Sequence, residues 1–312
     1  MRLGEAISQY IAYRHALGAV FKYDGQCLTA FARFLGVERT LVGVSRSQVL
    51  RFLYGKGPVT SNWHAKFYAL RGFYDYAISR KYITSSPLPK KIPTRPPRFV
   101  PYIYSKEEMR SLLRACLGYR GRKIDPKMMR TLLLLLYGAG LRIRETIRLT
   151  VADVDFSTDC ITIRKTKFRK SRVIPFGTQL GKELRRYAVK WRPCRPPQQD
   201  DAFFITDDGK PLKQVTVEKA FKVIRGKASV CRTDGARYQP RLHDMRHTFA
   251  VRRLISWYRQ GADVQALLPV LSTYLGHVNL AATAVYLTMI PELLDQASAR
   301  FQAYMLQENA NE

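Results

Sequence analysis

A proline-rich, basic stretch divides this chain into two unequal parts. Six of its prolines lie at positions 87, 89, 93, 96, 97 and 101, and Lys90, Lys91, Arg95 and Arg98 lie between them. Proline removes a backbone hydrogen-bond donor and favours extended structure, so neither a helix nor a central strand is expected to cross this stretch. The sequence therefore predicts two domains, residues 1–86 and 103–312, joined by a linker at residues 87–102.

The charge of the chain predicts a polyanionic partner. The 53 lysines and arginines outnumber the 24 acidic residues and leave a formal net charge of +29. Such a field attracts nucleic acid before contact. The linker's cations would suit a path along phosphates, and a solvated basic spacer explains them equally well. The longest apolar run, around residues 132–136, falls far short of the roughly 20 residues that span a bilayer, so we expect no membrane segment.

The N-terminus and the cysteines indicate a cytoplasmic protein. The first ten residues, MRLGEAISQY, lack the apolar stretch and the cleavage site of a secretory signal. The five cysteines are scattered singly with no C-x-x-C pair, which favours reduced thiols over a disulfide framework or a zinc site. They are Cys27, Cys116, Cys160, Cys194 and Cys231.

Helical spacing dominates the part before the linker. Apolar residues recur every three or four positions within residues 3–17, 27–35, 49–53 and 63–78. Each segment is long enough for one short helix. The sequence therefore predicts a small all-α domain of four helices.

Capping signals open the second part. Ser105 and Glu108 form the sequence pattern of a capping box, which places a helix start near residue 105. Asp125 followed by Pro126 provides an N-cap and a first-turn proline before the apolar stretch through Leu136. Two helices are expected there.

A change of period marks a small sheet. Residues 160–163 (Cys-Ile-Thr-Ile) and 172–176 (Arg-Val-Ile-Pro-Phe) are typical of short β-strands, with a basic hairpin turn at 164–170 between them. Helical spacing then returns at 180–187, 217–224, 249–257 and 280–304. The predicted fold class is mainly α with a small antiparallel β-sheet.

Three side chains could together cleave a phosphodiester bond. Attack on phosphorus needs a nucleophile, cations on the non-bridging oxygens and an acid for the leaving oxygen. Tyr286 can supply a phenolate, although a tyrosine with an ordinary pKa of about 10 needs nearby cations or a base at neutral pH. Arg142 and Arg246 can each direct two N–H donors at phosphate oxygens, a geometry that lysine lacks.

Two histidines have spacings that would bring them to these groups. His243 and Arg246 are three residues apart, so at a helix start they share a face. His277 follows an expected helix end, and Asn279 would cap a short helix that leads to Tyr286. Singly, each is more often a core or structural residue, and only their order and spacing together favour a site. Two arginines and a lysine could offset phosphate charge without a metal or another cofactor.

Four motifs together resemble the tyrosine recombinase, or phage integrase, family. They are Gly138-Ala-Gly-Leu-Arg142-Ile-Arg-Glu145, Leu242-His-Asp-Met-Arg-His-Thr-Phe249, Tyr274-Leu-Gly-His277 and Tyr286. The likeness covers residues from about 103 to 290. It implies an N-terminal four-helix, SAM-like core-binding domain that binds DNA, followed by a C-terminal α+β catalytic domain of the tyrosine recombinase type.

The resemblance also implies a role for each motif residue. Arg142 and Arg246 would hold the scissile phosphate, and Tyr286 would attack it. His243 would accept a proton or contact the phosphate, and His277 would donate a hydrogen bond to a non-bridging oxygen.

Two further roles are implied around these residues. Glu145 would orient the arginine turn. In the family a lysine on the β-hairpin turn protonates the leaving 5′ oxygen, and Lys167 matches that position best. Lys165 and Lys170 lie in the same turn and compete for the role.

Two stretches depart from the pattern or leave alternatives open. The segment between Arg246 and His277, which contains residues 257–261 and 264–269, is longer than expected and is interpreted as an extended helix and a loop. After Tyr286, a helical stripe either packs into the chain's own core or docks on a neighbouring subunit. The stripe consists of Leu293, Leu294, Ala297, Phe301 and Tyr304.

The function implied is site-specific DNA recombination of the integrase or transposase type. Strands would be cleaved and rejoined through a covalent 3′-phosphotyrosyl intermediate, without metal or ATP. The expected partner is double-stranded DNA, bound by a homo-tetramer on two DNA sites in a bacterial-type cytoplasm near the nucleoid, with no small-molecule substrate. The alternatives are a catalytically inactive DNA-binding regulator of the same fold, a type IB topoisomerase and a charge-driven structural or RNA-binding protein.

Overall fold

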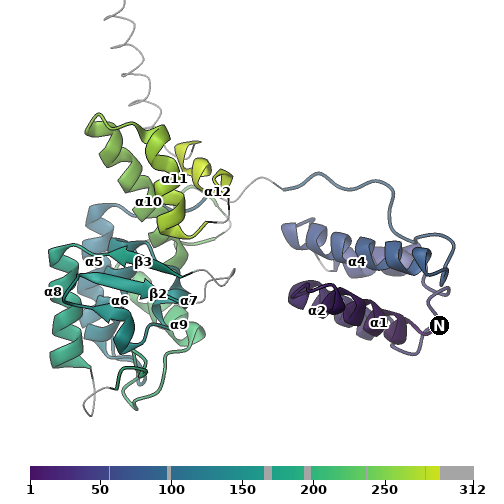
Figure 1. The fold of residues 1–312 in the computed structure, drawn as a ribbon, viewed down its shortest axis with the longest axis horizontal. Coiled ribbons are helices and arrows are strands. Elements are labelled where there is room, and N and C mark those ends of the chain that lie inside the picture. Colours follow the sequence, from purple (N-terminus) through teal and green to yellow (C-terminus); the bar gives the residue numbers. More distant parts are fainter. Residues whose placement is uncertain are drawn as a thin grey trace, which may run out of the picture. The chain divides into compact units, whose positions relative to one another are not determined.

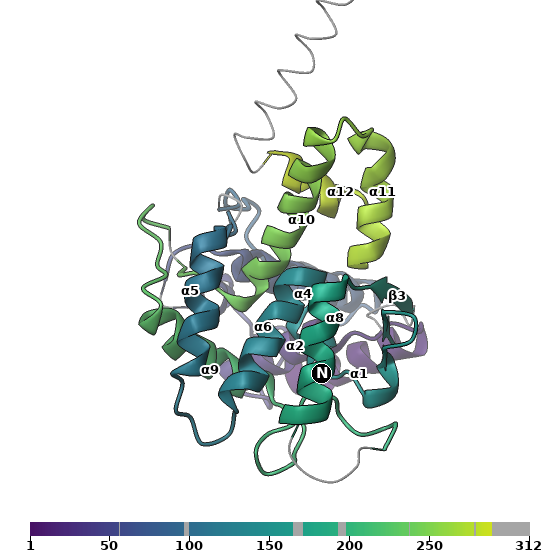
Figure 2. The ribbon, with the colours of Figure 1, turned by 90° about the vertical axis from the view of Figure 1, so that its left-hand side faces the viewer.

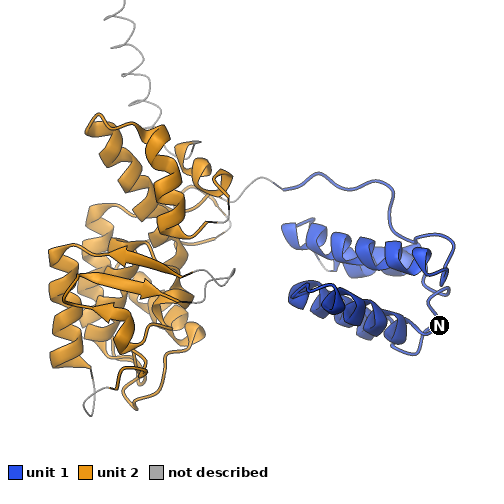
Figure 3. Ribbon diagram, in the orientation of Figure 1, with its two compact units in different colours: residues 1–99 blue, residues 100–312 orange. Residues whose placement is uncertain are grey.

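The chain forms two compact units, residues 1–99 and 100–312 (Figure 3). The computed structural model describes residues 1–55, 57–96, 100–164, 171–192, 198–236, 238–277 and 279–288. Helices make up most of the described elements, and a small sheet lies in the second unit (Figure 1). The predicted fold class, mainly α with a small antiparallel β-sheet, is confirmed. None of the described helices is long and apolar enough to cross a membrane.

Four helices build the described part of unit 1. They are α1 (Leu3–Ala16), α2 (Lys22–Leu35), α3 (Arg46–Tyr54) and α4 (Ser61–Ser79). The other three helices pack on α4, whose buried side chains include Trp63 and Phe67 with rings stacked 5.4 Å apart. Helical spacing in the sequence therefore located the elements of this unit, while its role as a core-binding domain stays a prediction.

The start of the predicted linker packs against unit 1. His64 is buried in α4, and its Nε2 lies 3.0 Å from the carbonyl oxygen of Pro93. The guanidinium of Arg95 lies 6.0 Å from the ring centroid of Tyr68, also in α4. This segment is consequently more than a solvated spacer as far as residue 96.

Unit 2 is built around α6 (Pro126–Ala139), with α5 (Lys106–Leu117) and α8 (Thr178–Arg186) beside it (Figure 2). The capping box of Ser105 and Glu108 opens α5, and the Asp125 side chain caps α6, both as predicted. Burial by neighbours on several sides explains the continuous leucine stretch of α6. The remaining long helix of this layer is α9 (Gln214–Lys227).

The sheet of unit 2 is a three-stranded antiparallel meander. Its strands are β1 (Val154–Asp155), β2 (Cys160–Ile163) and β3 (Arg172–Pro175), in the order β1-β2-β3. Ile161 pairs with Ile174, and both are fully buried, so alternate residues point into the core as the period of two predicts. Between β2 and β3, residues 165–170 of the predicted basic turn lie outside the described residues.

The last described elements form a further group of helices, the first of which also packs against α6. They are α10 (Leu242–Arg259), α11 (Val264–Leu275), α12 (Ala281–Ala284) and a 3₁₀ turn (Val285–Thr288). Between Arg246 and His277, where an extended helix and a loop were expected, α10 runs to Arg259, residues 260–263 form a short connection, and the Asp263 side chain caps the start of α11. The helix expected at 280–304 is not continuous, since α12 ends after one turn. The apolar stripe from Leu293 onward lies outside the described residues.

Candidate active site

The predicted site residues that the structure describes lie near the C-terminal ends of α6 and α11. Arg142 stands at the start of the short helix α7 (Ile143–Thr146), two residues after Gly140 ends α6. His243 and Arg246 lie in the first turns of α10, His277 follows α11, and Tyr286 lies in the 3₁₀ turn. Asn279 accepts a hydrogen bond from the backbone N–H of Ala282, so the predicted cap of this connection is confirmed.

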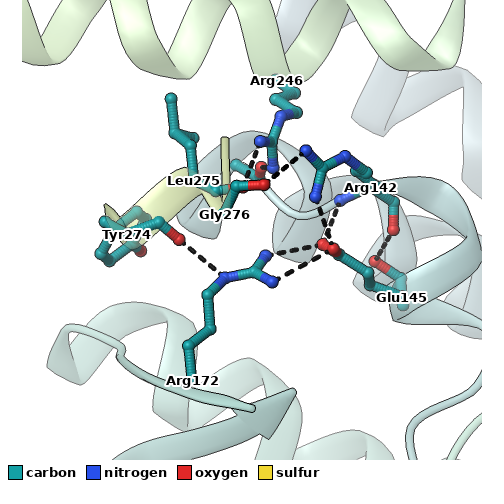
Figure 4. A network of polar contacts seen from close by, with 9 residues as sticks. Arg142, Glu145, Arg172, Arg246, Tyr274, Leu275 and Gly276 are labelled. Atoms are coloured by element: carbon teal, nitrogen blue, oxygen red, sulfur yellow. Dashed lines mark hydrogen bonds and ion pairs between the residues drawn. The ribbon is translucent and has the colours of Figure 1, made fainter. Parts of the chain in front are cut away.

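Arg246 links the ends of two helices from a buried position. Its side chain is 2% exposed, and Nη1 donates to the carbonyl oxygen of Gly140 over 2.9 Å while Nη2 donates to that of Leu275 (Figure 4). Both acceptors are carbonyls left unpaired at helix C-termini, where a cation is favoured. The guanidinium is thereby held in one orientation.

Arg142 contacts the same helix end from the other side. Its Nη2 donates to the carbonyl oxygen of Gly276 over 2.9 Å, and its Nη1 donates to Oε1 of Glu145 over 2.8 Å. The side chain is 35% exposed, so part of the guanidinium faces solvent. Two arginines separated by a hundred residues thus converge on the Leu275–Gly276 backbone.

Glu145 supports the arginine turn, in the position predicted for it. Its carboxylate accepts the backbone N–H of Arg142 over 3.0 Å and receives a two-point ion pair from Arg172. Burial alone would raise the pKa of Glu145, but the hydrogen bonds from Arg172 and the Arg142 backbone and the charge of Arg172 lower it below its ordinary value. Glu145 is therefore a charged anchor at neutral pH.

Arg172 is a site residue that the sequence did not reveal. It opens β3, where alternation predicts only an ordinary strand residue, yet its side chain is 9% exposed. Its Nε donates to the carbonyl oxygen of Tyr274 over 2.8 Å, in addition to the pair with Glu145 (Figure 4). No local pattern signals this, because both partners are distant in sequence.

The motif glycines are required by backbone geometry. Gly140 and Gly276 end α6 and α11 with φ of +62° and +64°, which favours glycine. A β-carbon at Gly276 would stand 2.8 Å from Nη1 of Arg172. Next to it, the backbone N–H of His277 donates to the carbonyl oxygen of Ser272, so the turn that ends α11 also fixes the position of this histidine.

Tyr286 lies among histidines in a buried position. Its side chain is 3% exposed, and its hydroxyl lies 3.0 Å from Nδ1 of His247. The ring of His277 lies 6.2 Å from that of Tyr286, and its Nδ1 is 2.7 Å from the hydroxyl of Thr283. Burial raises the pKa of Tyr286, whereas the charges of Arg246 and Arg142 lower it in part.

His247 is the second residue that sequence reasoning missed. It stands beside Arg246 in the motif, four residues after His243, and this i,i+4 spacing was the available signal. The His243 ring packs edge-on against that of His247 at 4.9 Å, but His243 makes no hydrogen bond to Tyr286 within the described residues. Unlike Tyr286, His243 is exposed.

The predicted leaving-group acid lies outside the described residues. Lys167 and its competitors Lys165 and Lys170 all fall in the undescribed segment 165–170. In the described ranges, no group of three or more His, Cys, Asp or Glu residues is placed to hold a metal ion. Cys27, Cys116, Cys160 and Cys231 are free thiols, and Cys194 is not described.

The arrangement can bind and polarise an oxyanion. Arg142 and Arg172 bond the carboxylate of Glu145, and Arg246 lies close enough to feel its charge, so the three arginines leave excess positive charge. Burial, reinforced by the charge of Arg142, lowers the pKa of Arg246 to about 9, so it stays charged at neutral pH while being poorly solvated. An incoming phosphate oxygen would relieve that repulsion and meet preoriented donors.

The chain is similar to several known proteins over much of its length. A profile described as "Phage integrase family" matches residues 103–291. A putative integrase/recombinase, y4rE of Sinorhizobium fredii, is 37% identical over 308 residues, which cover 96% of this chain and 95% of that protein. Tyrosine recombinase XerC of Staphylococcus carnosus is 28% identical over 240 residues, 76% of this chain and 74% of that protein.

A solved structure shares the fold. The Tn1549 transposon integrase, solved in complex with a circular intermediate DNA, matches with a TM-score of 0.72 and 18% identity over 97% of this chain and 99% of that chain. The profile covers more than half of this chain, and the S. fredii relative exceeds 30% identity over nearly its full length. The chain therefore belongs to the phage integrase family of tyrosine recombinases.

Proposed function

We propose that this protein is a site-specific DNA recombinase that cleaves and rejoins strands through a covalent bond between Tyr286 and a DNA 3′-phosphate. The observation that carries the proposal is the meeting of Tyr286, Arg142, Arg246 and His277 around the end of α11. These residues come from three separate regions of the sequence. Taken with the family, their convergence favours phosphoryl transfer over binding alone.

The cleavage step follows from the charges of the site. The scissile phosphate would bind to Arg142 and Arg246, with His243 and His277 as further contacts on its non-bridging oxygens. The Tyr286 oxygen attacks phosphorus, a P–O bond to tyrosine forms, and the bond to the 5′ oxygen breaks. Lys167 would protonate that leaving oxygen. The buried guanidinium groups stabilise the charge that grows on the phosphate, so the reaction is proposed to need no metal.

Rejoining reverses the same step. A 5′-hydroxyl from the partner DNA attacks the phosphotyrosine, and Tyr286 becomes the leaving group. The covalent link conserves the phosphodiester bond energy, so no ATP is required. Strand exchange between two sites is proposed to use four copies of the chain.

Double-stranded DNA is the proposed substrate and partner. The net charge of +29 provides the electrostatic attraction, and the Tn1549 relative of the same fold is described as bound to DNA. Unit 1 would then act as the core-binding domain, with the linker cations near phosphates. Because Tyr286 is 3% exposed, some of the residues packed around its hydroxyl must move when DNA binds, so that a phosphate can reach it.

The test is a trapping assay with suicide DNA. The protein is incubated, in EDTA and without ATP, with DNA from its own flanking sequence that carries a nick just beyond the scissile phosphate. The short fragment with the new 5′-hydroxyl then diffuses away, and the covalent adduct accumulates on a denaturing gel. We expect an adduct with the unaltered protein and none with Tyr286→Phe.

Binding is measured in parallel on the same DNA. Protein that binds the site tightly yet forms no adduct would overturn the recombinase proposal and leave a DNA-binding regulator of the same fold. Relaxation of supercoiled DNA by a single copy, with no exchange between two sites, would instead indicate a topoisomerase.

A further inference from the structure

We propose that His247 is a catalytic residue of this site and that its Nδ1 takes the proton from the Tyr286 hydroxyl as the strand is cleaved. The inference rests on the proposed function and assigns the acceptor that tyrosine attack requires. His247 would return the same proton to Tyr286 when the strand is rejoined.

The contacts of the three site histidines single out His247. Its Nδ1 lies 3.0 Å from the Tyr286 hydroxyl, which is hydrogen-bond distance for direct transfer. Nδ1 of His277 is occupied by the Thr283 hydroxyl at 2.7 Å, and that ring meets Tyr286 only through its face. His243 is exposed and reaches Tyr286 only through the His247 ring, which suits a phosphate contact.

The surroundings keep the imidazole of His247 uncharged before DNA arrives. Burial lowers its pKa to about 3, and nearby cations and histidines add to the effect. These groups are His243 and Arg246 on α10, Arg241 just before that helix and His277 after α11, while Tyr286 faces the ring from the 3₁₀ turn. A neutral imidazole has one nitrogen free to accept a proton.

Binding of DNA should raise the pKa of His247, which makes it a better proton acceptor. A phosphodiester anion close to the ring favours the protonated imidazole, because an opposite charge stabilises it. Arg246 and Arg142 already lower the pKa of Tyr286 against the effect of burial. The nucleophile is therefore protonated and inert without DNA, and the acceptor becomes effective only when its substrate is present.

The proposed step is balanced. The O–H bond of Tyr286 breaks and its proton moves to Nδ1 of His247, while the freed electron pair forms the bond to phosphorus. The bond from phosphorus to the 5′ oxygen breaks, and that oxygen takes its proton from the acid, proposed as Lys167. In rejoining, the protonated imidazole donates to the departing tyrosine oxygen.

A pair of DNA substrates separates this role from that of the acid. In one the leaving group is the normal 5′ oxygen, and in the other it is sulfur, which needs no protonation. Covalent adduct formation is measured in single turnover on DNA already bound. His247→Asn places an amide oxygen near the site of Nδ1, so it keeps a hydrogen-bond acceptor that cannot take the proton.

We expect His247→Asn to slow adduct formation by about 10²–10⁴-fold on both substrates. Lys167→Ala should be slow with oxygen and restored with sulfur. His247→Asn should also recover as the pH rises, about tenfold per unit, because hydroxide replaces the lost acceptor, whereas the unaltered protein should not. Glu218→Gln, at an exposed position on α9, is the control substitution and should leave the rate unchanged.

Three results would overturn the inference. They are a His247→Asn rate close to that of the unaltered protein, restoration of that variant by sulfur, and a rate deficit that does not respond to pH. If the unaltered protein itself forms no adduct on bound DNA with either substrate, the proposed function fails instead.

A measurement on the unaltered protein covers the case in which the variant does not fold. Nitrogen NMR of His247 at neutral pH should show Nε2 protonated and Nδ1 bare, the tautomer that accepts from the tyrosine. A proton on Nδ1 would make the imidazole the donor in this contact and would overturn the proposal.

Discussion

Arg172 and Glu145 form a two-point ion pair, with 2.8 Å between Nη2 and Oε2 and 3.2 Å between Nη1 and Oε1. Their side chains are only 9% and 12% exposed. The pair joins β3 to α7, and the bond from Arg172 to Tyr274 extends the connection to α11. It therefore ties together the strand that follows the predicted lysine turn, the turn that carries Arg142 and the helix end that carries His277.

Removing Arg172 should loosen all three segments. Arg172→Ala leaves Glu145 buried with one ion-pair partner fewer, so we expect the free energy of unfolding to fall by about 3 kcal/mol. Urea unfolding measures the loss. Arg186→Ala removes an exposed partner of Glu183, and it should cost less than about 1 kcal/mol. Equal losses from the two variants would show that the buried ion pair stabilises the fold no more than an exposed one.

Gly276 should resist substitution for two separable reasons. Alanine there must adopt φ near +64° and must also push Arg172 away from its partners. Gly209→Ala is the matched control, because its φ of +77° is similar but nothing lies within 4 Å of the new β-carbon. We expect a loss of about 1–3 kcal/mol from the backbone in both variants. A further loss of stability in Gly276→Ala alone, together with reduced adduct formation, would show the cost of displacing Arg172.

The stability of unit 2 should fall as the pH drops below neutral. Burial lowers the pKa of His247 to about 3 and that of His277 to about 4, below the value of about 6.5 in an unfolded chain. Their stabilisation is complete above about pH 6.5 and is lost toward the folded pKa, because the unfolded chain binds protons first. Each histidine should cost about 2 kcal/mol between pH 6.5 and 5.

Urea unfolding at a series of pH values checks this expectation. His247→Asn removes one of the two groups, so its stability should decline less steeply with acid than that of the unaltered protein. A variant with the same slope would show that His247 is not held neutral in the folded state.

Arg246→Lys tests whether the forked guanidinium is required. A lysine keeps the charge but cannot reach the carbonyls of Gly140 and Leu275 and a phosphate together. We expect adduct formation to fall by about 10²–10³-fold, with DNA affinity changed much less. Arg252→Lys, on the same helix with its guanidinium above the Tyr137 ring, is the control and should cleave normally. A parallel loss of affinity and cleavage would assign Arg246 to DNA binding alone.

Local sequence patterns located many of the elements of this protein and selected its candidate site residues. Capping residues and apolar spacing located α5, α6 and the four helices of unit 1, because these signals act within a few residues of chain. Motif order likewise selected Arg142, Arg246 and Tyr286 before any geometry was known.

Only the tertiary structure revealed Arg172 and His247. Arg172 contacts partners 27 and 102 residues away, and His247 meets Tyr286 across 39 residues. Such contacts depend on how α7, β3, α10 and α11 pack, and no local periodicity encodes them. The burial that neutralises His247 is likewise a property of the assembled layer and not of its neighbours in the chain. The sequence by itself thus determined which chemical groups are present, and packing decided which of them lie in contact.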